Sequence, residues 1–238
     1  MAGLRTPTGA FVLAGLIAAL PGCAVAQALL SAGYDELARD LDARVTFETL
    51  PRRDEPGIVL DAPLRDGLTW IAERFAGQRR DASEPVFDTI LGAPRAPLDV
   101  RAGERGANQS VAFHRGFGSS ALFPLGPAGF PALEARGEGS TAILFDQDQH
   151  AFGLRLHSDY PDPLGQRDHA TGTVTLTFYT RQGREIARVV RRLEPGITEL
   201  GFRRAGGLPD IAGVLILSDD PGGIAIDDIL YQTAPVTG

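Results

Sequence analysis

The chain has 238 residues, enough for one sizeable domain, and its 43% hydrophobic and 22% charged residues are ordinary for a globular protein with a core. Its 23 basic residues, all of them arginine, are outnumbered by 30 acidic ones. The net charge of −7 argues against binding to nucleic acid or to an anionic membrane surface. The single cysteine, Cys23, excludes an intrachain disulfide and a cysteine-based zinc site.

Residues 1–26 have the pattern of a secretory signal peptide. Arg5 supplies a positive charge, residues 9–20 form an apolar stretch too short for a comfortable bilayer span, and Ala24 and Ala26 form a small-x-small cleavage pattern. We therefore expect a secreted or periplasmic protein whose mature chain begins at Gln27 and has no transmembrane span. In the alternative interpretation, the stretch ending at Cys23 is a lipobox and the protein is anchored through a lipid on Cys23.

The mature chain divides into a short leader and one larger domain. Leucines and Tyr34 recur near helical spacing over residues 28–41, which predicts a short helical leader within residues 27–44. From residue 45 to residue 234, glycine and proline interrupt the chain about every ten residues, a spacing typical of an all-β antiparallel sandwich. The clearest predicted strands are 141–145, 152–156, 172–180, 185–191, 197–202, 211–217 and 224–231.

Two short motifs stand at opposite ends of this domain. Residues 45–51 read VTFETLP, and residues 222–231 read GGIAIDDILY. Together they resemble secreted bacterial jelly-roll β-sandwiches, a group that includes carbohydrate-binding modules, MAM-like domains and the extracellular domains of PEP-CTERM exported proteins. The resemblance implies a jelly roll whose first and last strands lie side by side and share a structural calcium ion. No Pro-Glu-Pro motif precedes Gly238, so sorting by the PEP-CTERM route is not expected.

The residues themselves also favour calcium at this place. Calcium binds six to eight hard oxygen atoms, and carboxylates supply the negative charge. Successive residues of a strand face opposite sides, so one of Asp227 and Asp228 is turned inward, where a carboxylate needs a partner or a metal. We expect Glu48 and Asp227 to bind the ion directly, with Asp228 as a supporting or alternative ligand.

Other metal patterns are weaker. Residues 146–157 begin like an EF-hand loop but have Ala151 where glycine is required and His157 where the bidentate glutamate should be. The four histidines have no helical metal-binding spacing. We therefore predict no histidine metal site and no cofactor other than calcium.

The chain contains no nucleophile elbow, phosphate-binding loop or dinucleotide fingerprint. We expect a non-catalytic binding or surface-associated module, with an extracellular glycan or another cell-surface component as its partner. Trp70 and Tyr160 are the candidate aromatic platforms, although aromatic residues make up only 7% of the chain. The alternatives are a polysaccharide hydrolase with paired carboxylates, for which Glu73 is the most suggestive acid, and a lipid-anchored structural protein of the envelope.

Overall fold

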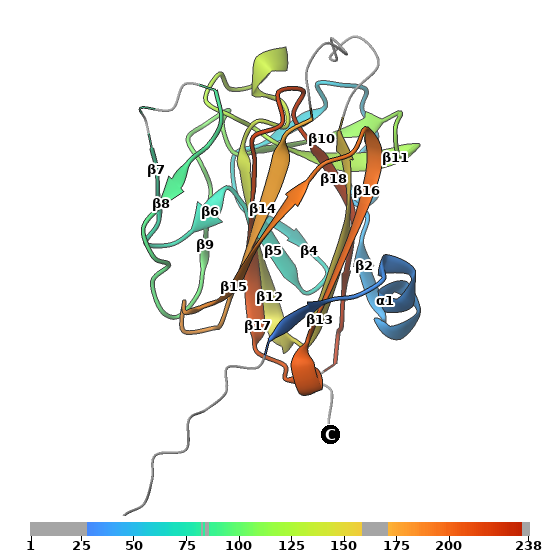
Figure 1. Cartoon of the computed structure of the whole chain (residues 1–238). Helices are drawn as coiled ribbons and strands as arrows, with labels where there is room; N and C mark the ends of the chain where they lie inside the picture. Colours follow the sequence, from blue (N-terminus) through green and yellow to red (C-terminus); the bar gives the residue numbers. More distant parts are fainter. Residues whose placement is uncertain (1–27, 82, 84–85, 159–170, 235–238) are drawn as a thin grey trace, which may run out of the picture.

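The computed structural model describes residues 28–81, 83, 86–158 and 171–234, and it shows two β-sheets packed against each other (Figure 1). Every pairing between named strands is antiparallel, so the prediction of an all-β protein is confirmed. The eight-stranded sheet has the order β1-β16-β13-β18-β11-β10-β3, and β2 also pairs with β18. The six-stranded sheet has the order β15-β14-β17-β12-β5-β4.

The strands of the eight-stranded sheet are β1 (Leu29–Ser31), β2 (Ala43–Val45), β3 (Ile58–Leu60), β10 (Gln109–His114), β11 (Ser119–Pro124), β13 (Ala151–Ser158), β16 (Gly196–Arg204) and β18 (Ala225–Tyr231). Those of the six-stranded sheet are β4 (Leu64–Asp66), β5 (Thr69–Ala72), β12 (Ser140–Gln149), β14 (Thr173–Tyr179), β15 (Glu185–Arg192) and β17 (Ile211–Ser218). All seven strands predicted for the C-terminal half are present, most of them slightly longer than the sequence indicated.

The main core lies between the two sheets because alternate residues of each strand face inward. In β14, Val174, Leu176 and Phe178 are fully buried, as strict alternation requires. Phenylalanine rings from both sheets meet in this layer. The centroid of the Phe178 ring lies 5.1 Å from that of Phe202 and 6.0 Å from that of Phe152, with the rings edge to face.

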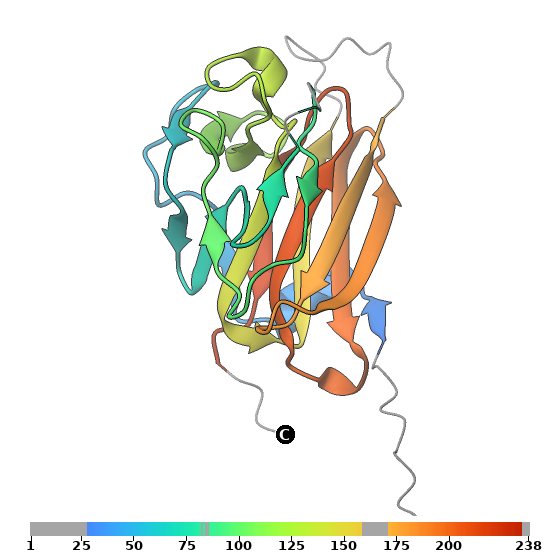
Figure 2. The ribbon, with the colours of Figure 1, turned by 90° about the vertical axis from the view of Figure 1, so that its left-hand side faces the viewer.

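An arm over residues 73–107 covers part of the outer face of the six-stranded sheet (Figure 2). It contains two small sheets, β6 (Arg74–Phe75) with β9 (Val100–Arg101) and β7 (Arg79–Arg80) with β8 (Ile90–Leu91). Phe75, Leu98 and Val100 of the arm pack on apolar residues of the sheet, including Leu215. The arm therefore buries these apolar residues of the outer face of the sheet.

The expected helical leader is only partly helical. Helix α1 (Tyr34–Asp40) lies on the outer face of the eight-stranded sheet, where Tyr34 and Leu37 are buried against Leu230. Residues Leu29–Ser31 form strand β1 instead, paired with the edge of β16. Unpaired backbone groups along that edge offer hydrogen bonds that override the weak helical pattern of these three residues. Two 3₁₀ turns, η1 (Leu133–Ala135) and η2 (Ala205–Gly207), complete the structure.

The first strand of the predicted domain lies beside the last. Strand β2 pairs with β18 so that Val45 faces Ile229 and Ala43 faces Tyr231. The opening strand thus lies beside the closing one, as the resemblance implied, although only Val45 of β2 belongs to the predicted domain. The pairing brings the turn that carries Glu48 next to the closing strand. Among the described residues, no helix is long and apolar enough to cross a membrane.

Candidate functional sites

Asp227 in β18 is a buried carboxyl group with only 2% of its surface exposed. Its Oδ2 accepts a hydrogen bond of 2.6 Å from the Ser119 hydroxyl, and its Oδ1 accepts one of 2.7 Å from the Asp228 amide. Burial raises the pKa of Asp227 to about 7, and the charges of Asp228 and Glu48 act in the same direction. The sequence-based expectation that one residue of this Asp pair turns inward is met by Asp227.

Glu48 lies in the turn after β2 and is largely exposed. Its Oε1 accepts a hydrogen bond of 2.5 Å from the amide of Ser120, the residue next to the Ser119 that binds Asp227. The start of β11 therefore brings Glu48 and Asp227 into one neighbourhood, as the calcium hypothesis required. Sequence reasoning missed these two serines, because no local pattern connects them to a strand more than 100 residues away.

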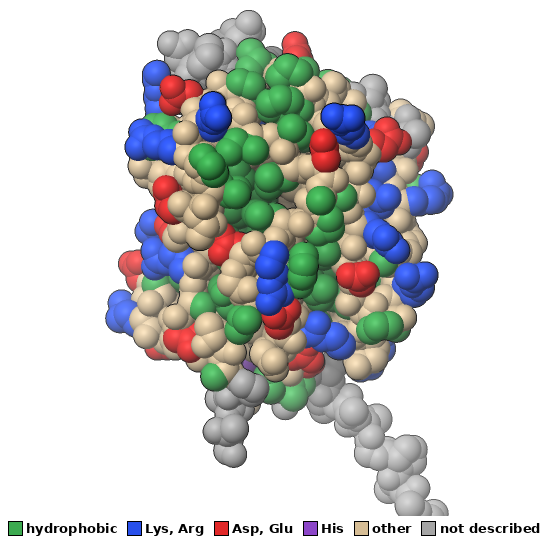
Figure 3. Space-filling model, turned by 180° about the vertical axis from the view of Figure 1, so that it is seen from behind, with side chains coloured by type: hydrophobic (Ala, Val, Ile, Leu, Met, Phe, Trp, Pro, Cys, Tyr) green, Lys and Arg blue, Asp and Glu red, His purple; other side chains and the backbone are tan. Residues whose placement is uncertain are grey.

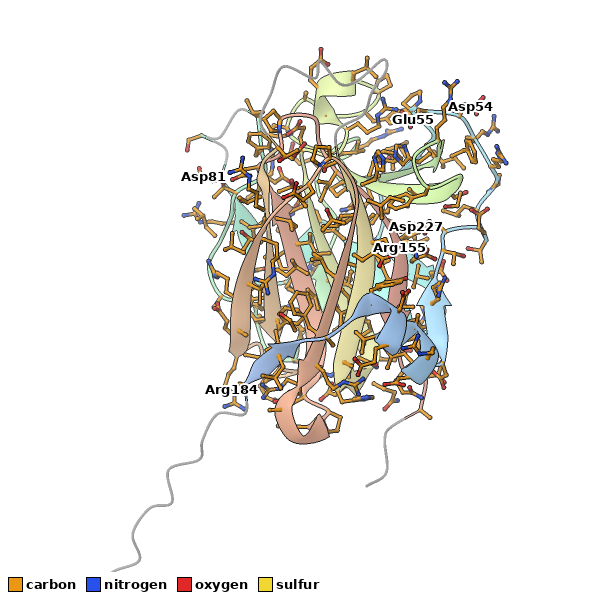
Figure 4. All side chains as sticks on the ribbon, turned by 45° about the vertical axis from the view of Figure 1, so that its right-hand side comes forward. Asp54, Glu55, Asp81, Arg155, Arg184 and Asp227 are labelled. Atoms are coloured by element: carbon orange, nitrogen blue, oxygen red, sulfur yellow. The ribbon has the colours of Figure 1, made fainter. Side chains whose placement is uncertain are left out.

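Asp228 points elsewhere. Its carboxylate makes ion pairs with Arg44 at 3.2 Å and with Arg155 at 3.0 Å. Figure 4 shows Arg155 and Asp227 together on this side of the sandwich, consistent with their paired positions in β13 and β18. Within the described part of the chain, no three carboxylate, histidine or cysteine side chains are arranged to hold a metal ion. A cation at Glu48 and Asp227 would need its remaining ligands from backbone carbonyls or water.

The backbone at this site is unusual. Phe47 and Asp228 have φ angles of 59° and 51°, and they are the only non-glycine residues with positive φ in the described ranges. Each one adjoins a proposed ligand: Phe47 fills the core while the chain turns Glu48 outward, and Asp228 directs its carboxylate away from that of Asp227. Residues held in this region cost free energy and tend to occur at functional sites.

Trp70 is 37% exposed on β5, and the guanidinium of Arg65 lies 5.0 Å from the centroid of its ring system. Arg65 also makes two hydrogen bonds, of 2.7 and 2.5 Å, to the carboxylate of Asp146. Asp146 lines an open groove of about 340 Å³ whose other lining residues are Gln147, Asp148, Arg181 and Pro209. We call Trp70, Arg65 and the residues of this groove the Trp70 surface.

The charged side chains of the Trp70 surface are fixed in pairs. Arg181 binds the Oδ1 of Asp148 through two nitrogens, at 3.0 and 2.6 Å, and donates a third hydrogen bond to the backbone oxygen of Asp146. The segment that begins like an EF-hand loop thus has arginine partners for both of its aspartates. Tyr160, the other predicted platform, lies outside the described residues.

A buried polar cluster lies at one end of the eight-stranded sheet. His114 Nδ1 is 3.1 Å from Glu55 Oε1, and Arg136 approaches the other oxygen of Glu55 to 2.5 Å. The rings of His114 and His157 meet edge to face with their centroids 4.7 Å apart. A Cβ at Gly116 would lie 2.5 Å from the Nε2 of His157 and 2.7 Å from that of His114, so the loop packs tightly over both rings. The sequence analysis considered the histidines only for their metal-binding spacing and missed this cluster.

A second group of buried carboxyl groups includes Glu138, two residues after Arg136 in the chain. Glu138 is 5% exposed, and its Oε2 has no hydrogen-bond partner in the described structure. Burial, together with the charge of Asp220, raises the pKa of Glu138 to about 8. The pKa of Asp88, whose amide donates a hydrogen bond to the Glu138 backbone oxygen, is also raised by burial. Glu138 is therefore protonated at neutral pH.

Glu73, the acid that the sequence made most suggestive, is 1% exposed and forms an ion pair with the guanidinium of Arg74. Arg80 lies 4.0 Å away on its other side. A Cβ at Gly103 would come within 2.5 Å of the Glu73 Oε1, so backbone packs directly on this carboxylate. The Glu73 carboxylate therefore pairs with two arginines of the arm and does not face an open cleft.

Comparison with known proteins identifies no relative close enough to assign a family. No protein-family model and no curated protein match the chain. Two solved structures show a distant similarity: the enzymatically active domain of tailspike protein 4 of bacteriophage CBA120 (TM-score 0.29) and the arabinose-bound α-L-arabinofuranosidase MgGH51 (TM-score 0.30), each 13% identical. Each alignment covers 52% of this chain, and the matched parts are 17% and 22% of the respective solved chains.

Proposed function

We propose that this protein is a non-catalytic extracellular module that binds a saccharide at the Trp70 surface. The observation that carries the proposal is an exposed indole beside a groove whose polar groups are paired and fixed. A sugar ring can stack its C–H face on an indole while its hydroxyl groups bond to carboxylates and guanidinium groups. Because Arg65 with Asp146 and Arg181 with Asp148 are already ordered, binding would cost little side-chain entropy.

The chain offers a direct test, because Trp70 is its only tryptophan. Tryptophan fluorescence of residues 27–238 would be recorded against a panel of soluble neutral polysaccharides, and hits would be measured by calorimetry. We expect a change in Trp70 emission on binding and at least about a tenfold loss of affinity in Trp70→Ala and Asp148→Asn. Arg105→Gln, which removes a highly exposed arginine elsewhere, serves as the control. A panel without any hit, or hits that survive Trp70→Ala, would overturn the proposal.

We further propose that the sandwich is a jelly roll with a structural calcium ion at Glu48 and Asp227. The pairing of β2 with β18 and the two left-handed residues beside the ligands support this assignment. The raised pKa of Asp227 fits it as well, since a divalent cation would offset the repulsion from neighbouring carboxylates. In this proposal Asp228 does not bind the ion. It supports the site by tying the closing strand to Arg44 and Arg155.

Thermal unfolding with calcium and with chelator tests the cation. A ligand that binds only the folded state raises stability by about 2.7 kcal/mol at a hundredfold excess over Kd. We expect a calcium-dependent rise in Tm that is lost in Glu48→Gln and in Asp227→Asn but kept in Asp228→Asn. Equal unfolding curves with and without calcium would refute the calcium site, and they would not bear on the saccharide site.

The hydrolase alternative needs two carboxyl groups that face each other across an open cleft. Glu138 and Asp220 interact electrostatically, but they are only 5% and 2% exposed and so offer a polysaccharide no such access. Release of reducing sugar from a polysaccharide would favour the hydrolase over the binding module. Labelling with a lipid precursor distinguishes a secreted protein from a lipid-anchored one. Only an anchored protein would be labelled, and Cys23→Ala would abolish that labelling.

A further inference from the structure

The outer face of β14 and β15 carries hydroxyl and guanidinium groups in register. Strand β15 is an edge strand of the six-stranded sheet (Figures 1 and 2). Across the pair, Thr173 faces Arg192 and Thr175 faces Val190. Their neighbours along β14, Val174 and Leu176, point into the core, so the threonines point outward. We call Thr173, Thr175, Arg188, Val190 and Arg192 the Thr–Arg face.

A groove of about 290 Å³ adjoins this face. Thr173 and Thr175 form part of its floor together with Leu217, Ser218 and Asp219 of β17 and the loop after it. Phe87, Asp88 and Thr89 of the arm form its wall. The groove therefore combines hydroxyl groups with apolar side chains and lies alongside the arginine-bearing edge strand.

The charge of this edge differs from that of the molecule as a whole. Four of the nine residues from 184 to 192 are arginines, in a chain whose net charge is −7. Arg184, Arg188 and Arg192 are exposed, and Figure 4 shows Arg184 at the end of the sandwich away from Asp227. Arg188 has one exposed ion pair, at 3.2 Å from Glu185, which contributes little. The edge thus presents several guanidinium groups that an anionic ligand could bind.

The acidic side chains near the groove are occupied or buried. Asp219 accepts hydrogen bonds from both the amide and the hydroxyl of Thr173, and the Thr173 hydroxyl lies 3.1 and 3.0 Å from its two oxygens. Asp88 is 4% exposed and accepts two hydrogen bonds from Ser140. Neither of these carboxylates lies on β15, whose one acidic residue, Glu185, is paired with Arg188, so the arginines form the charged side of the surface.

We propose that the Thr–Arg face and its groove bind an anionic polysaccharide, a chain whose sugar units carry carboxylates. Guanidinium groups pair with carboxylates through two parallel hydrogen bonds, and hydroxyl groups bond equally well to sugar hydroxyls. Arg188 and Arg192 are four residues apart on an extended strand, or about 13 Å, which separates carboxylates on different sugar units. Val190, 54% exposed between them, and Phe87 offer apolar contact to sugar C–H groups.

The inference rests on the proposed role as a saccharide-binding module, but it uses a different surface and a different ligand class. Its test compares sodium polygalacturonate with fully methyl-esterified polygalacturonate, two polymers with one backbone that differ in charge. Calorimetry at low ionic strength should give at least about tenfold tighter binding to the acid form, weakening as salt is added.

The variants are chosen so that charge alone cannot explain the result. Arg188→Gln with Arg192→Gln should weaken binding of polygalacturonate about tenfold or more. Arg79→Gln with Arg101→Gln removes the same charge from exposed residues of the arm and should change affinity less than about twofold. Thr175→Val keeps the shape of the floor, removes one hydroxyl and should weaken binding about threefold to tenfold. Unchanged Tm values would show that each variant is folded.

Four outcomes overturn the inference. Equal affinity for both polymers would show that charge does not drive binding. An equal loss of affinity in the two double variants would show that the ligand does not bind at the Thr–Arg face. Equal binding of polyglutamate shows a general polyanion surface and not a saccharide site. Quenching of Trp70 by a neutral polysaccharide without binding of polygalacturonate refutes this inference alone. Binding of polygalacturonate with no neutral hit refutes the Trp70 surface and supports the Thr–Arg face.

Discussion

Glu138 shows how far a single buried group can depart from its ordinary chemistry. Its pKa of about 8 follows first from burial and then from the charge of Asp220. In the unfolded chain the same carboxyl titrates at about its usual 4.5. Between these two pH values the folded state binds the extra proton, so this group makes folding less favourable as pH rises from about 4.5 to 8.

Glu138→Gln removes that pH dependence while keeping the size and shape of the side chain. We expect little change in Tm at pH 5, where Glu138 is protonated in the folded protein. At pH 9 the variant should exceed the wild type by roughly 5 °C or more, because the wild type must bury a charge. Glu134→Gln, at an exposed position four residues earlier, should follow the wild type at both pH values. A stabilisation of Glu138→Gln that is the same at both pH values would contradict the assignment.

Glycine positions allow a second prediction at the residue scale. Gly137 has φ of 85°, and a Cβ there would lie 2.3 Å from the amide nitrogen of Ile224. Gly207 has φ of 70°, but nothing lies within 4 Å of its Cβ position. Gly137→Ala should therefore lose about 3 kcal/mol or more of the free energy of unfolding, and Gly207→Ala about 1 kcal/mol, measured in urea. Equal losses would mean that backbone strain, and not the close contact, decides.

At this scale the sequence predicted half of the closing-strand site. The alternation of β18 foretold that one of Asp227 and Asp228 is buried. It could not foretell that Asp228 binds Arg44 and Arg155, which are 184 and 73 residues away in the chain. The same holds for Glu138 and for the histidine pair, because their surroundings come from loops whose course no local pattern fixes.

Among the secondary-structure elements, the C-terminal strands were the most predictable and the leader the least. Strands such as β14 carry period-two alternation, β-branched residues and clear turns at both ends, so local and tertiary preferences agree. Residues 28–41 carry only a weak helical pattern, and the edge of β16 takes three of them as a strand. The arm over residues 73–107 was not foreseen, since its two-residue strands are too short to leave a periodic signal.

Helix α1 packs on the sheet through two buried side chains, Tyr34 and Leu37. Leu37 is fully buried between the helix and the eight-stranded sheet, in a cluster with Tyr34 and Leu230. Leu37→Ala should reduce the free energy of unfolding by about 2–5 kcal/mol, because it removes buried methyl groups and leaves a cavity. Glu36→Ala, on the exposed side and with one weak ion pair to Arg203, should cost less than about 1 kcal/mol. A similar cost for both variants in urea unfolding would show that α1 does not pack as described.

The whole molecule has one main core shared by both sheets, so we expect one cooperative unfolding transition. Fluorescence of Trp70 reports on the six-stranded sheet, while far-ultraviolet circular dichroism reports on all strands. The two melting curves of residues 27–238 should coincide within experimental error. Loss of the Trp70 signal several degrees below the dichroism transition would show that β4 and β5 unfold separately. Chelator should lower both curves together if the proposed calcium ion is present.

Charge is spread unevenly over this molecule. The face seen from behind in Figure 3 intersperses acidic and basic side chains around a central band of hydrophobic ones, so it carries no strong field of one sign. The four arginines within residues 184–192 depart from that mixture. Edge strands with charged side chains also resist pairing with other chains, so β15 is protected against aggregation whether or not a ligand is bound.

The pairing of the opening and closing strands has a mechanical consequence. Because β2 and β18 are antiparallel neighbours, the start of β2 at Ala43 and the end of β18 at Tyr231 lie at the same end of the pair. Tension applied between residues 28 and 234 would act across the ladder of hydrogen bonds and break them one after another, beginning with β1 on the edge of β16. Under such tension the strands would separate one hydrogen bond at a time, at low force. Strands pulled in opposite directions along their length would resist more, because all their hydrogen bonds would have to break together.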